Sequence, residues 1–289
     1  MITGLIVGAY RRRFEVEIAP GTVQSCAIRG RTLVPACGDR VELESQGGRD
    51  EAVIVSIQPR CSMLARQDAW RQKVVAANVD TVIGVVAVAP PFNPDLVDRW
   101  TVAAEAARCR FVLVVNKIDL PDADGVVARL SLYATLGYAV VPLRAKQGID
   151  PLRPYLADAH SVLVGQSGMG KSTIINAATG QLRAKTGDVS AALNAGTHTT
   201  THTRLHHLAD GDAWIVDSPG MQEFGVNQLS TAELEHAFVD FRPHLGNCRF
   251  RNCAHAEEPG CAIAAAVESG SIAASRYAAF RRMRSEVDR

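Results

Sequence analysis

An octapeptide near the middle of the chain has the composition of a phosphate-binding loop. Gly165-Gln166-Ser167-Gly168-Met169-Gly170-Lys171-Ser172, followed by Thr173, fits the pattern G-x-x-x-x-G-K-[S/T] without a mismatch. Glycines let backbone N–H groups surround a phosphate, and a helix that starts there directs its positive end at the same group. We expect Lys171 to reach the β- and γ-phosphates during catalysis and the Ser172 hydroxyl to bind Mg²⁺. A chance glycine-rich turn is the alternative, but an apolar strand precedes the motif and an apolar helix start follows it.

A second motif, Asn116-Lys117-Ile118-Asp119, has the residue types that recognise guanine. Guanine presents N7 and O6 as acceptors and its N2 amino group as a donor. Because a carboxylate accepts hydrogen bonds from the ring N1–H and this amino group together, Asp119 suits guanine and not adenine. Asn116 is expected on the N7 and O6 side, with the stem of Lys117 over the ring. Alone, the tetrapeptide could be a surface turn, but at the end of a buried strand and beside a phosphate loop the binding function is favoured. Arg144-Ala145-Lys146 is a weaker candidate for a loop that supports the base.

Asp217-Ser218-Pro219-Gly220 follows a short apolar stretch and fits a D-x-x-G motif. In this interpretation Asp217 helps to hold Mg²⁺ and the Gly220 N–H senses the γ-phosphate; an ordinary Pro-Gly turn is the alternative. Ras-type enzymes have a Gln after this glycine to orient the attacking water, whereas this chain has Met221. Intrinsic hydrolysis is therefore expected to be slow and to depend on a partner that orders the site.

The segment Gly196-Thr197-His198-Thr199-Thr200-Thr201 is the candidate for the remaining catalytic groups. Thr200 is expected to close on Mg²⁺ and the γ-phosphate, and His198 to place the attacking water. For His198, a solvent-exposed loop histidine is an equal alternative. Residues 184–203, rich in Thr, Ala and Gly, are expected to form a mobile loop.

The order of these motifs is unusual, because the guanine motif at 116–119 precedes the phosphate loop at 165–172. An ordinary small GTPase has the phosphate loop first. Two motifs that must meet on one nucleotide but are swapped along the chain indicate a circularly permuted GTPase domain. The permutation also leaves only a short connector, Glu223-Phe224-Gly225, between the D-x-x-G motif and the last part of the chain. We therefore hypothesise that the γ-phosphate state controls the position of a C-terminal lobe.

Four potential metal ligands lie close together as Cys248-x4-Cys253-x-His255-x5-Cys261. Cys₃His is a standard tetrahedral zinc set, and four protein ligands leave no open position for catalysis. We expect one structural Zn²⁺ that stabilises a lobe with little core of its own; unliganded buried cysteines are the alternative. The other cysteines are scattered and are expected to be small core residues: Cys26, Cys37, Cys61 and Cys109.

The elements that must position these motifs change in type along the chain. Short apolar stretches at 5–7, 14–18, 23–28, 41–43 and 53–57, separated by Gly and Pro turns, suit an OB-like β-barrel, with an SH3-like barrel as the alternative. Strands at 79–89, 111–115, 138–143, 161–164 and 214–216 alternate with helices, as in a parallel sheet with right-handed crossovers. The predicted fold class is α/β: an OB-like, RNA-binding barrel at 1–62, a circularly permuted P-loop GTPase domain at 63–226 and a mostly helical zinc-binding domain at 227–289.

Composition narrows the class of protein. The chain has 289 residues, 47% of them apolar, which is enough for two or three domains with real cores. Its net charge of +1 gives no overall attraction to polyanions, so a nucleic-acid surface must be a local patch. No apolar run approaches the roughly 20 residues of a membrane span, and Arg11-Arg12-Arg13 follow the apolar start instead of preceding it, unlike in a signal peptide. We expect a cytoplasmic monomer without a membrane partner, whose cysteines are thiols or metal ligands.

Taken together, the motifs resemble those of bacterial small-ribosomal-subunit biogenesis GTPases of the RsgA (YjeQ) type. The similarity extends over nearly the whole chain and also includes Ala77-Asn78-Val79-Asp80 and residues 217–225. It implies an OB barrel, a permuted GTPase domain and a zinc domain, and GTP hydrolysis that the small (30S) subunit stimulates during late maturation of that particle. Two residues depart from the family pattern: Thr197 stands where a basic residue is common, and Ser218 where Thr is common.

The resemblance implies GTP and GDP as ligands and the small ribosomal subunit, with its rRNA, as partner. OB barrels bind RNA through one face and its loops. Arginines on the barrel and the last helix are candidates for phosphate contacts, although each run could equally be a solvated face: Arg11, Arg12, Arg13, Arg29, Arg31 and Arg40, then Arg276, Arg281, Arg282 and Arg284. Two other functions stay open: a nucleotide-gated RNA-binding switch with negligible turnover, which Met221 favours, and a P-loop kinase, which the guanine motif disfavours.

Overall fold

The N-terminal strands of the chain close into a small barrel. The computed structural model describes residues 2–10, 13–30, 32–45, 52–68, 71–180, 203–209, 212–217 and 224–288. Strand β1 pairs with both β2 and β4, which closes the order β1-β2-β3-β5-β4 into a ring, with β3 and β5 parallel. This is the strand order of an OB-fold, so the SH3-like alternative is set aside. The strands are β1 (Ile2–Ala9), β2 (Phe14–Ala19), β3 (Thr22–Ile28), β4 (Arg40–Ser45) and β5 (Ala52–Ile57).

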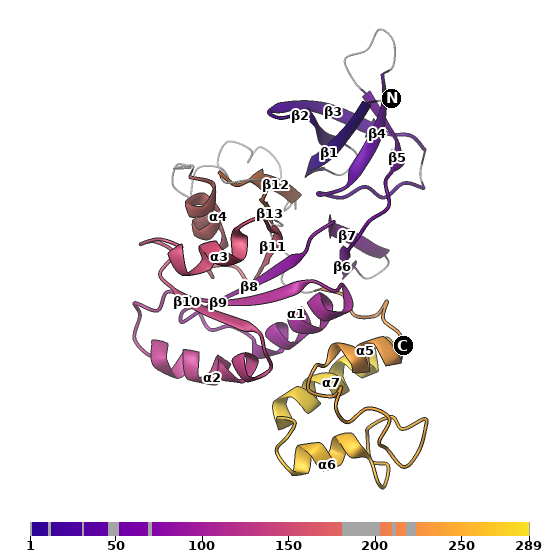
Figure 1. Ribbon diagram of the computed structural model, residues 1–289, viewed down its shortest axis with the longest axis vertical. Helices are drawn as coiled ribbons and strands as arrows, with labels where there is room; N and C mark the ends of the chain where they lie inside the picture. Colours follow the sequence, from indigo (N-terminus) through magenta and orange to yellow (C-terminus); the bar gives the residue numbers. More distant parts are fainter. Residues whose placement is uncertain are drawn as a thin grey trace.

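A parallel sheet follows the barrel, and helices cover both of its faces (Figure 1). Its order is β10-β9-β8-β11-β13, all parallel, with β12 antiparallel at the end. Alternate residues of β8 face opposite sides: Val82 and Val86 pack with α1 and α2, whereas Ile83 and Val85 pack with α3 and α4. Burial on both faces explains the continuous apolar runs of these strands. The elements are β8 (Thr81–Ala87), α1 (Pro94–Ala106), β9 (Arg110–Asn116), α2 (Ala123–Thr135), β10 (Ala139–Leu143), α3 (Arg153–Leu156), β11 (His160–Val164), α4 (Lys171–Thr179), β12 (Thr203–His207) and β13 (Trp214–Asp217).

The chain changes direction across this sheet beside β8. From β8 it continues to β9 and β10 on one side, and then returns to β11, which pairs with the other side of β8. In open α/β sheets, ligands bind outside the carboxyl ends of the strands at such a switch point. Asn116 ends β9, and the phosphate loop begins directly after β11. The topology therefore brings the two swapped motifs to the same edge of the sheet.

Three strands lie where the sequence pattern predicts none. β6 (Met63–Asp68) and β7 (Arg71–Ala77) form a separate hairpin, and β12 begins in the segment expected to be a loop; the rest of that segment lies outside the described residues. β12 reads Thr-Arg-Leu-His-His, so its polar residues hide the strand. It pairs with β13 on one side and with barrel strand β1 on the other, where Gly8 lies opposite Arg204. The barrel and the parallel sheet thus share one 11-stranded sheet.

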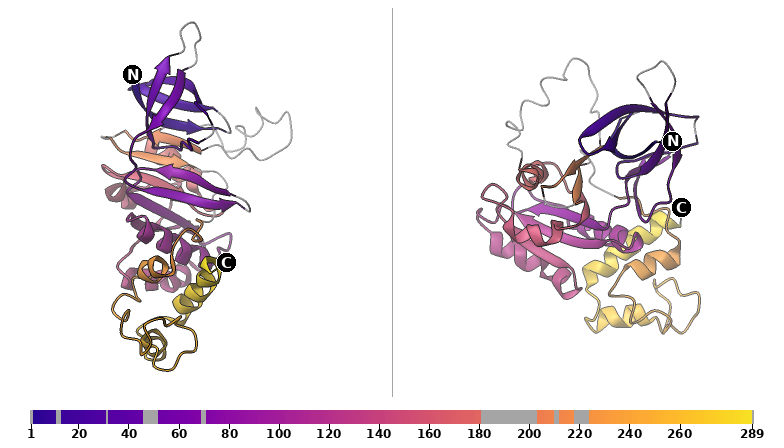
Figure 2. Two further views of the ribbon diagram at one scale, coloured as in Figure 1. Left: turned by 90° about the vertical axis from the view of Figure 1, so that its right-hand side faces the viewer. Right: turned by 45° about the horizontal axis from the view of Figure 1, so that its top comes forward.

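The C-terminal part forms a helical lobe with its own core. Helices α5 (Thr231–Ala237), α6 (Ala262–Glu268) and α7 (Ala274–Val287) surround Phe238, Phe241 and Phe280, all of which are fully buried. The lobe packs against α1, at the opposite end of the molecule from the barrel (Figure 2). Within the described ranges, no helix combines the length and apolar character that a membrane crossing requires.

Arg276 is buried where the lobe meets α1, so the prediction that it contacts RNA is wrong. Its Nη1 donates hydrogen bonds to Asp98 (2.8 Å) and to the Thr101 hydroxyl (3.2 Å), and its Nη2 donates to Asp240 (3.0 Å). The guanidinium also lies 4.5 Å from the ring centre of Phe238. Burial raises the pKa of Asp98, and the adjacent Arg276 charge opposes that rise. Arg276, which the sequence pattern places on the polar side of its helix, therefore joins the C-terminal lobe to α1.

The scattered cysteines are mostly core residues. Cys26, Cys37 and Cys109 are buried, as expected. Cys61 is exposed, so its prediction as a core residue is wrong. It lies in the connection after the barrel, where its backbone N–H donates to Asn78 Oδ1 at 2.9 Å; a connecting segment at the surface gives its side chain no core to enter.

Candidate functional site

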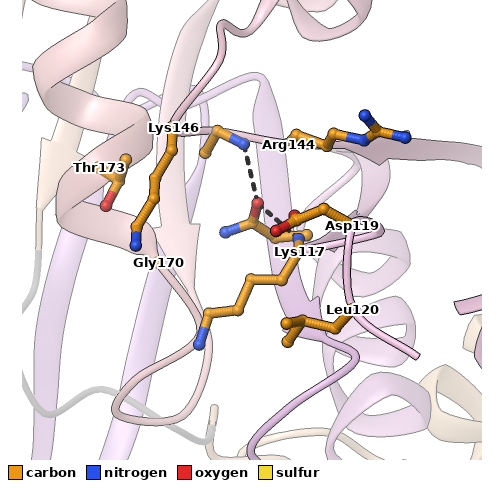
Figure 3. Close-up of a pocket in the computed structure, with 9 residues that line it drawn as sticks. Lys117, Asp119, Leu120, Arg144, Lys146, Gly170 and Thr173 are labelled. Carbon is orange, nitrogen blue, oxygen red and sulfur yellow. Dashed lines mark hydrogen bonds between the residues drawn. The ribbon is translucent and has the colours of Figure 1, made fainter. Parts of the chain in front are cut away.

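The guanine motif and the phosphate loop meet at one pocket (Figure 3). Figure 3 shows the side chains of Lys117 and Lys146 extending into the same space, whereas the guanidinium of Arg144 points away from them. The volume is about 270 Å³, and the lining comes from both motifs and from the loop after β10: Asn116, Lys117, Asp119, Leu120, Arg144, Ala145, Lys146, Gly170 and Thr173. Ile118 does not line it and instead packs against the core. A pocket built by these three segments fits a nucleotide base beside a phosphate loop.

The side chain of Asn116 joins the three segments. It is almost fully buried, and its Oδ1 accepts hydrogen bonds from the backbone N–H groups of Lys117 (2.8 Å) and Ala145 (3.0 Å). Its Nδ2 donates to the carbonyl of Met169 in the phosphate loop at 2.9 Å. Because the amide has two N–H donors, one remains for an acceptor such as guanine N7. The geometry therefore makes Asn116 a positioning residue as well as a candidate base contact.

Gly170 lies directly against this amide. A Cβ built at Gly170 would be 2.2 Å from Asn116 Nδ2, and the residue has φ +100°. Both the close approach and the left-handed backbone require glycine. On the other side, Lys117 Nζ donates to the carbonyls of Gly168 (2.8 Å) and Ala89 (2.7 Å). The two motifs thus hold each other in place through short polar contacts.

Lys171 begins α4 and lies inside the curve of the phosphate loop. Its Nζ donates to the carbonyls of Gly165 (2.5 Å) and Gln166 (2.9 Å). Burial lowers the pKa of Lys171, and the negative charge of Asp217 opposes this shift. A triphosphate offers this ammonium charged acceptors, which form stronger hydrogen bonds than neutral carbonyls. Lys171 is therefore placed where the sequence motif requires it.

The phosphate loop also contacts the start of α1, a contact that the motif does not reveal. Gln166 Oε1 accepts a hydrogen bond from the backbone N–H of Asn93 at 2.9 Å. Asn93 is the N-cap of α1, and its side chain accepts from the Asp95 N–H. The helix that carries the C-terminal lobe therefore begins at the phosphate loop.

Two oxygen donors in the described ranges suit Mg²⁺. Ser172 is exposed in the first turn of α4, and Asp217 ends β13 opposite Leu163 of β11, just before the phosphate loop. A hydroxyl and a carboxylate are ligands of the kind that Mg²⁺ prefers, so the donor set fits this ion. The remaining expected groups lie outside the described residues, and their roles stay predictions: His198, Thr200, Gly220 and Met221.

The Cys₃His cluster is assembled in the C-terminal lobe. One ligand atom from each of Cys248, Cys253, His255 and Cys261 lies within 4.8 Å of the others. His255 Nδ1 is 3.5 Å from the sulfur of Cys248 and 3.4 Å from that of Cys261. Three sulfurs and an imidazole nitrogen converging on one point fit a closed tetrahedral Zn²⁺ site. This convergence favours a metal site over the alternative of unliganded buried cysteines.

Glu235, which the sequence analysis missed, supports the metal-binding histidine. Its Oε1 lies 3.6 Å from His255 Nε2, the ring nitrogen that faces away from the cysteines. The interaction with the adjacent Glu235 carboxylate raises the pKa of His255 to about 9. A carboxylate behind a metal-binding imidazole orients the ring and increases its basicity. Glu235 belongs to α5, outside the cysteine window, so no local spacing could have shown it.

The arginines proposed for RNA differ in availability. Arg11, Arg12 and Arg31 lie outside the described residues. Several others already pair with carboxylates of this chain: Arg29 with Glu44, Arg282 with Asp95, and Arg284 with Glu235 and Asp288. Arg13, Arg40 and Arg281 are exposed. The last helix is therefore mainly an internal contact surface and a solvated face.

Comparison with known proteins extends these observations to the whole chain. A family model described as the RsgA GTPase matches residues 57–227. The small ribosomal subunit biogenesis GTPase RsgA of Nitrosomonas europaea is 44% identical, over 98% of this chain and 90% of the relative. The protein of the same name from Neisseria gonorrhoeae is 46% identical, over 96% of this chain and 89% of the relative.

Solved structures show the same architecture. The crystal structure of YjeQ from Thermotoga maritima has a TM-score of 0.72 at 32% identity, covering 99% of this chain and 98% of that one. YloQ, described as a circularly permuted GTPase, has a TM-score of 0.69 at 26% identity, covering 100% of this chain and 95% of that one. The predicted fold class and the permutation are thereby confirmed. The chain belongs to the RsgA GTPase family and is a GTP-hydrolysing enzyme with a circularly permuted GTPase domain.

Proposed function

We propose that this GTPase acts in late maturation of the small (30S) ribosomal subunit, that it binds rRNA, and that the subunit stimulates its hydrolysis of GTP. The names of its relatives support the subunit as partner. The observation that carries the nucleotide part is the hydrogen bond between Asn116 and the Met169 carbonyl, which joins the guanine motif to the phosphate loop. We further propose that the protein works in the cytoplasm as a monomer that cycles between GTP and GDP.

In this proposal each motif has a separate role in the nucleotide site. Asp119 accepts from guanine N1–H and the amino group, while the loop from Gly165 to Thr173 and Lys171 hold the phosphates. Ser172, Asp217 and Thr200 hold Mg²⁺, and the Gly220 N–H senses the γ-phosphate.

With Met221 unable to orient water, His198 takes that task. Replacing His198 by Ala is expected to leave GTP affinity unchanged and to lower turnover, while the same change at the exposed His236 alters neither; unchanged turnover in His198→Ala contradicts this role.

The proposed division of the chain assigns RNA binding to the barrel at 1–62, nucleotide chemistry to residues 63–226 and structural zinc binding to residues 227–289. Separate hydrophobic cores in the sheet and the C-terminal lobe support the second boundary. The pairing of β1 with β12 makes the first boundary a shared sheet rather than a flexible linker.

The direct test is GTP hydrolysis by the purified full chain, alone and with purified small subunits. Large subunits at the same concentration control for nonspecific RNA effects, and excess ATP tests base selection. We expect small subunits to accelerate phosphate release, large subunits to have little effect, and ATP not to compete. Equal rates with both subunits contradict the proposed partner, and competition by ATP contradicts the proposed base contacts.

One alternative has an observation in its favour. Met221 in place of the water-orienting glutamine suits a nucleotide-gated RNA-binding switch with negligible turnover. The same assay distinguishes it, because such a switch binds GTP tightly, and its turnover stays negligible when small subunits are added.

A further inference from the structure

The loop between the first two cysteines of the zinc cluster carries an unusual exposed side chain. Phe250 is 42% exposed, and among the aromatic residues in the described ranges it alone is exposed. The other phenylalanines of this lobe, Phe238, Phe241 and Phe280, fill its core. Core packing therefore does not explain why Phe250 is aromatic.

The loop around Phe250 is held on both sides. Cys248 and Cys253, the flanking residues of the zinc set, fix its two ends. The Cys253 N–H donates to the Phe250 carbonyl at 3.3 Å, and the Arg249 N–H donates to the Gly260 carbonyl at 3.0 Å. A ring on such a loop is pre-organised, so a ligand that binds it loses little affinity to ordering of the protein.

Two exposed arginines flank the ring in the sequence, and one of them also lies over it. The guanidinium of Arg249 lies 5.5 Å from the ring centre of Phe250. Arg249 and Arg251 are both exposed, and neither forms an ion pair within the part of the chain that the structure describes. The nearby carboxylate of Glu258 is instead occupied by the N–H groups of Ala254 and Ala256, at 2.8 Å each. The tip of the loop therefore presents an aromatic side chain and two positive charges that no carboxylate of the described residues neutralises.

We propose that Phe250 is a stacking platform for an unpaired base of an RNA strand, with Arg249 and Arg251 on the adjacent phosphates. Single-stranded nucleic acids are bound by this combination of aromatic faces and basic side chains. An apolar protein partner would leave the two charges desolvated without compensation, whereas an RNA strand provides both the base and the phosphates. The inference rests on the proposed rRNA partner and adds the contact through which the zinc lobe binds RNA.

The test measures binding of the zinc-loaded full chain to a fluorescent single-stranded RNA of about 12 nucleotides, a length in the range of known single-strand sites. Phe250→Ala and Phe250→Leu are expected to weaken binding roughly 5- to 150-fold, because both remove the ring. Phe250→Trp is expected to bind at least as tightly as the wild type. Arg251→Gln is expected to reduce the slope of log K against log salt by about 0.7. Zinc content and melting temperature, measured for every variant, show whether the lobe is still folded.

Two results would overturn the proposal: wild-type affinity in Phe250→Leu, or no binding of the wild-type chain to the single strand. A photo-reactive residue at position 250 provides a second test on intact small subunits, where cross-linking to rRNA is expected and cross-linking only to a ribosomal protein contradicts it. The oligonucleotide measurement uses no ribosomes. Failure of subunit-stimulated hydrolysis with an intact Phe250 effect would therefore overturn the proposed function and not this contact.

Discussion

At the scale of single residues, the pocket depends on side chains that position one another. Asn116 uses its carbonyl oxygen and one N–H on backbone groups of this chain, which leaves one N–H for the base. The charged contact to guanine is therefore assigned to Asp119. A carboxylate is matched to guanine, which presents two adjacent N–H donors at N1 and N2. An amide at position 119 is matched instead to a base with a carbonyl at C2, such as xanthine.

Asp119→Asn is therefore expected to lower GTP affinity about 100-fold or more, because each hydrogen bond to a charged group contributes about 1.5–3 kcal/mol. Affinity for xanthosine triphosphate is expected to rise in the same variant. Titration with fluorescent nucleotides measures both changes. Asp124→Asn, which removes an exposed carboxylate from the nearby α2, is the control and should bind GTP like the wild type. Unchanged GTP affinity in Asp119→Asn would show that this side chain does not contact the base.

The contact between Gly170 and Asn116 has a matched control, because Gly170 precedes helix α4 and Gly180 follows its other end. Gly170→Ala places a methyl group where the Asn116 amide lies, whereas Gly180, also at positive φ (+64°), has open space around its Cβ position. Both substitutions carry the backbone cost of about 1–2 kcal/mol. Only Gly170→Ala is expected to weaken GTP binding, by about 5- to 150-fold, because it also breaks a buried hydrogen bond. Equal loss of GTP affinity in the two variants would mean that a methyl group at position 170 does not disturb the Asn116 side chain.

At the scale of elements, helices and strands with strong local sequence patterns were predicted well. Features that depend on tertiary contacts were not. The barrel strands and the buried strands of the sheet were visible because apolar runs are local signals. β12 was missed because its environment, between β13 and the barrel, was unknown from its polar sequence. Arg276 was misassigned for the same reason, since its partners Asp98 and Asp240 come from distant parts of the chain.

The candidate site was predictable to a similar extent. The phosphate loop and guanine motif have fixed spacings, so their meeting could be expected from the motifs alone. The supporting contacts could not, because Gln166 to Asn93 and Glu235 to His255 join residues with no sequence relation.

The buried arginine gives the element-scale prediction. Arg276→Met leaves Asp98 and Asp240 buried without a counter-charge and is expected to lower the free energy of unfolding by about 3–5 kcal/mol. Arg281→Met, on the exposed side of α7, is expected to change it by less than ~0.5 kcal/mol. Chemical denaturation of the two variants measures the difference. A loss in Arg276→Met no larger than in Arg281→Met would contradict the importance of this ion pair.

The stability of Arg276→Met relative to the wild type should also depend on pH in a defined direction. Burial already raises the pKa of Asp98 above its ordinary value, and loss of Arg276 removes an opposing effect, so the pKa rises further. A carboxyl with a higher pKa in the folded than in the unfolded state favours folding when protonated. The deficit of Arg276→Met should therefore shrink as pH falls toward the pKa of this carboxyl. A deficit that is constant with pH would point to lost packing rather than to unpaired charge.

At the scale of the whole molecule, the C-terminal lobe is attached to the GTPase domain in two ways. One is the connector after the D-x-x-G motif, where Phe224 is buried and the Gly225 N–H donates to Ala65 at 3.1 Å. The other is α1, whose Asp98 accepts a hydrogen bond from Arg276 of the lobe and whose Arg99 forms a bidentate contact with Glu286. The hypothesis that the γ-phosphate state controls the lobe remains a prediction, and these contacts add α1 as a second route to it. A lobe that keeps one position with GDP and with a GTP analogue would contradict the hypothesis.

Removal of the metal tests the independence of the lobe. Chelation of Zn²⁺, or Cys261→Ser, is expected to unfold the lobe, because a structural zinc site contributes about 10 kcal/mol or more to its folding. GTP affinity should change little, since the residues that line the nucleotide pocket lie outside the lobe. Cys61→Ser, at an exposed cysteine away from the cluster, is the control. Metal analysis, limited proteolysis and nucleotide titration together check this expectation; an intact lobe without metal would contradict a structural role for zinc.

The central claim is that the swapped motifs form one guanine-specific site whose hydrolysis responds to the small ribosomal subunit. The measurement that tests it most directly is hydrolysis of xanthosine triphosphate by Asp119→Asn, with and without small subunits, in the presence of competing GTP. We predict that small subunits accelerate this hydrolysis in the variant as they accelerate GTP hydrolysis in the wild type, and that GTP competes poorly in the variant. If subunits leave the rate unchanged, or if the variant still prefers GTP, the account is contradicted.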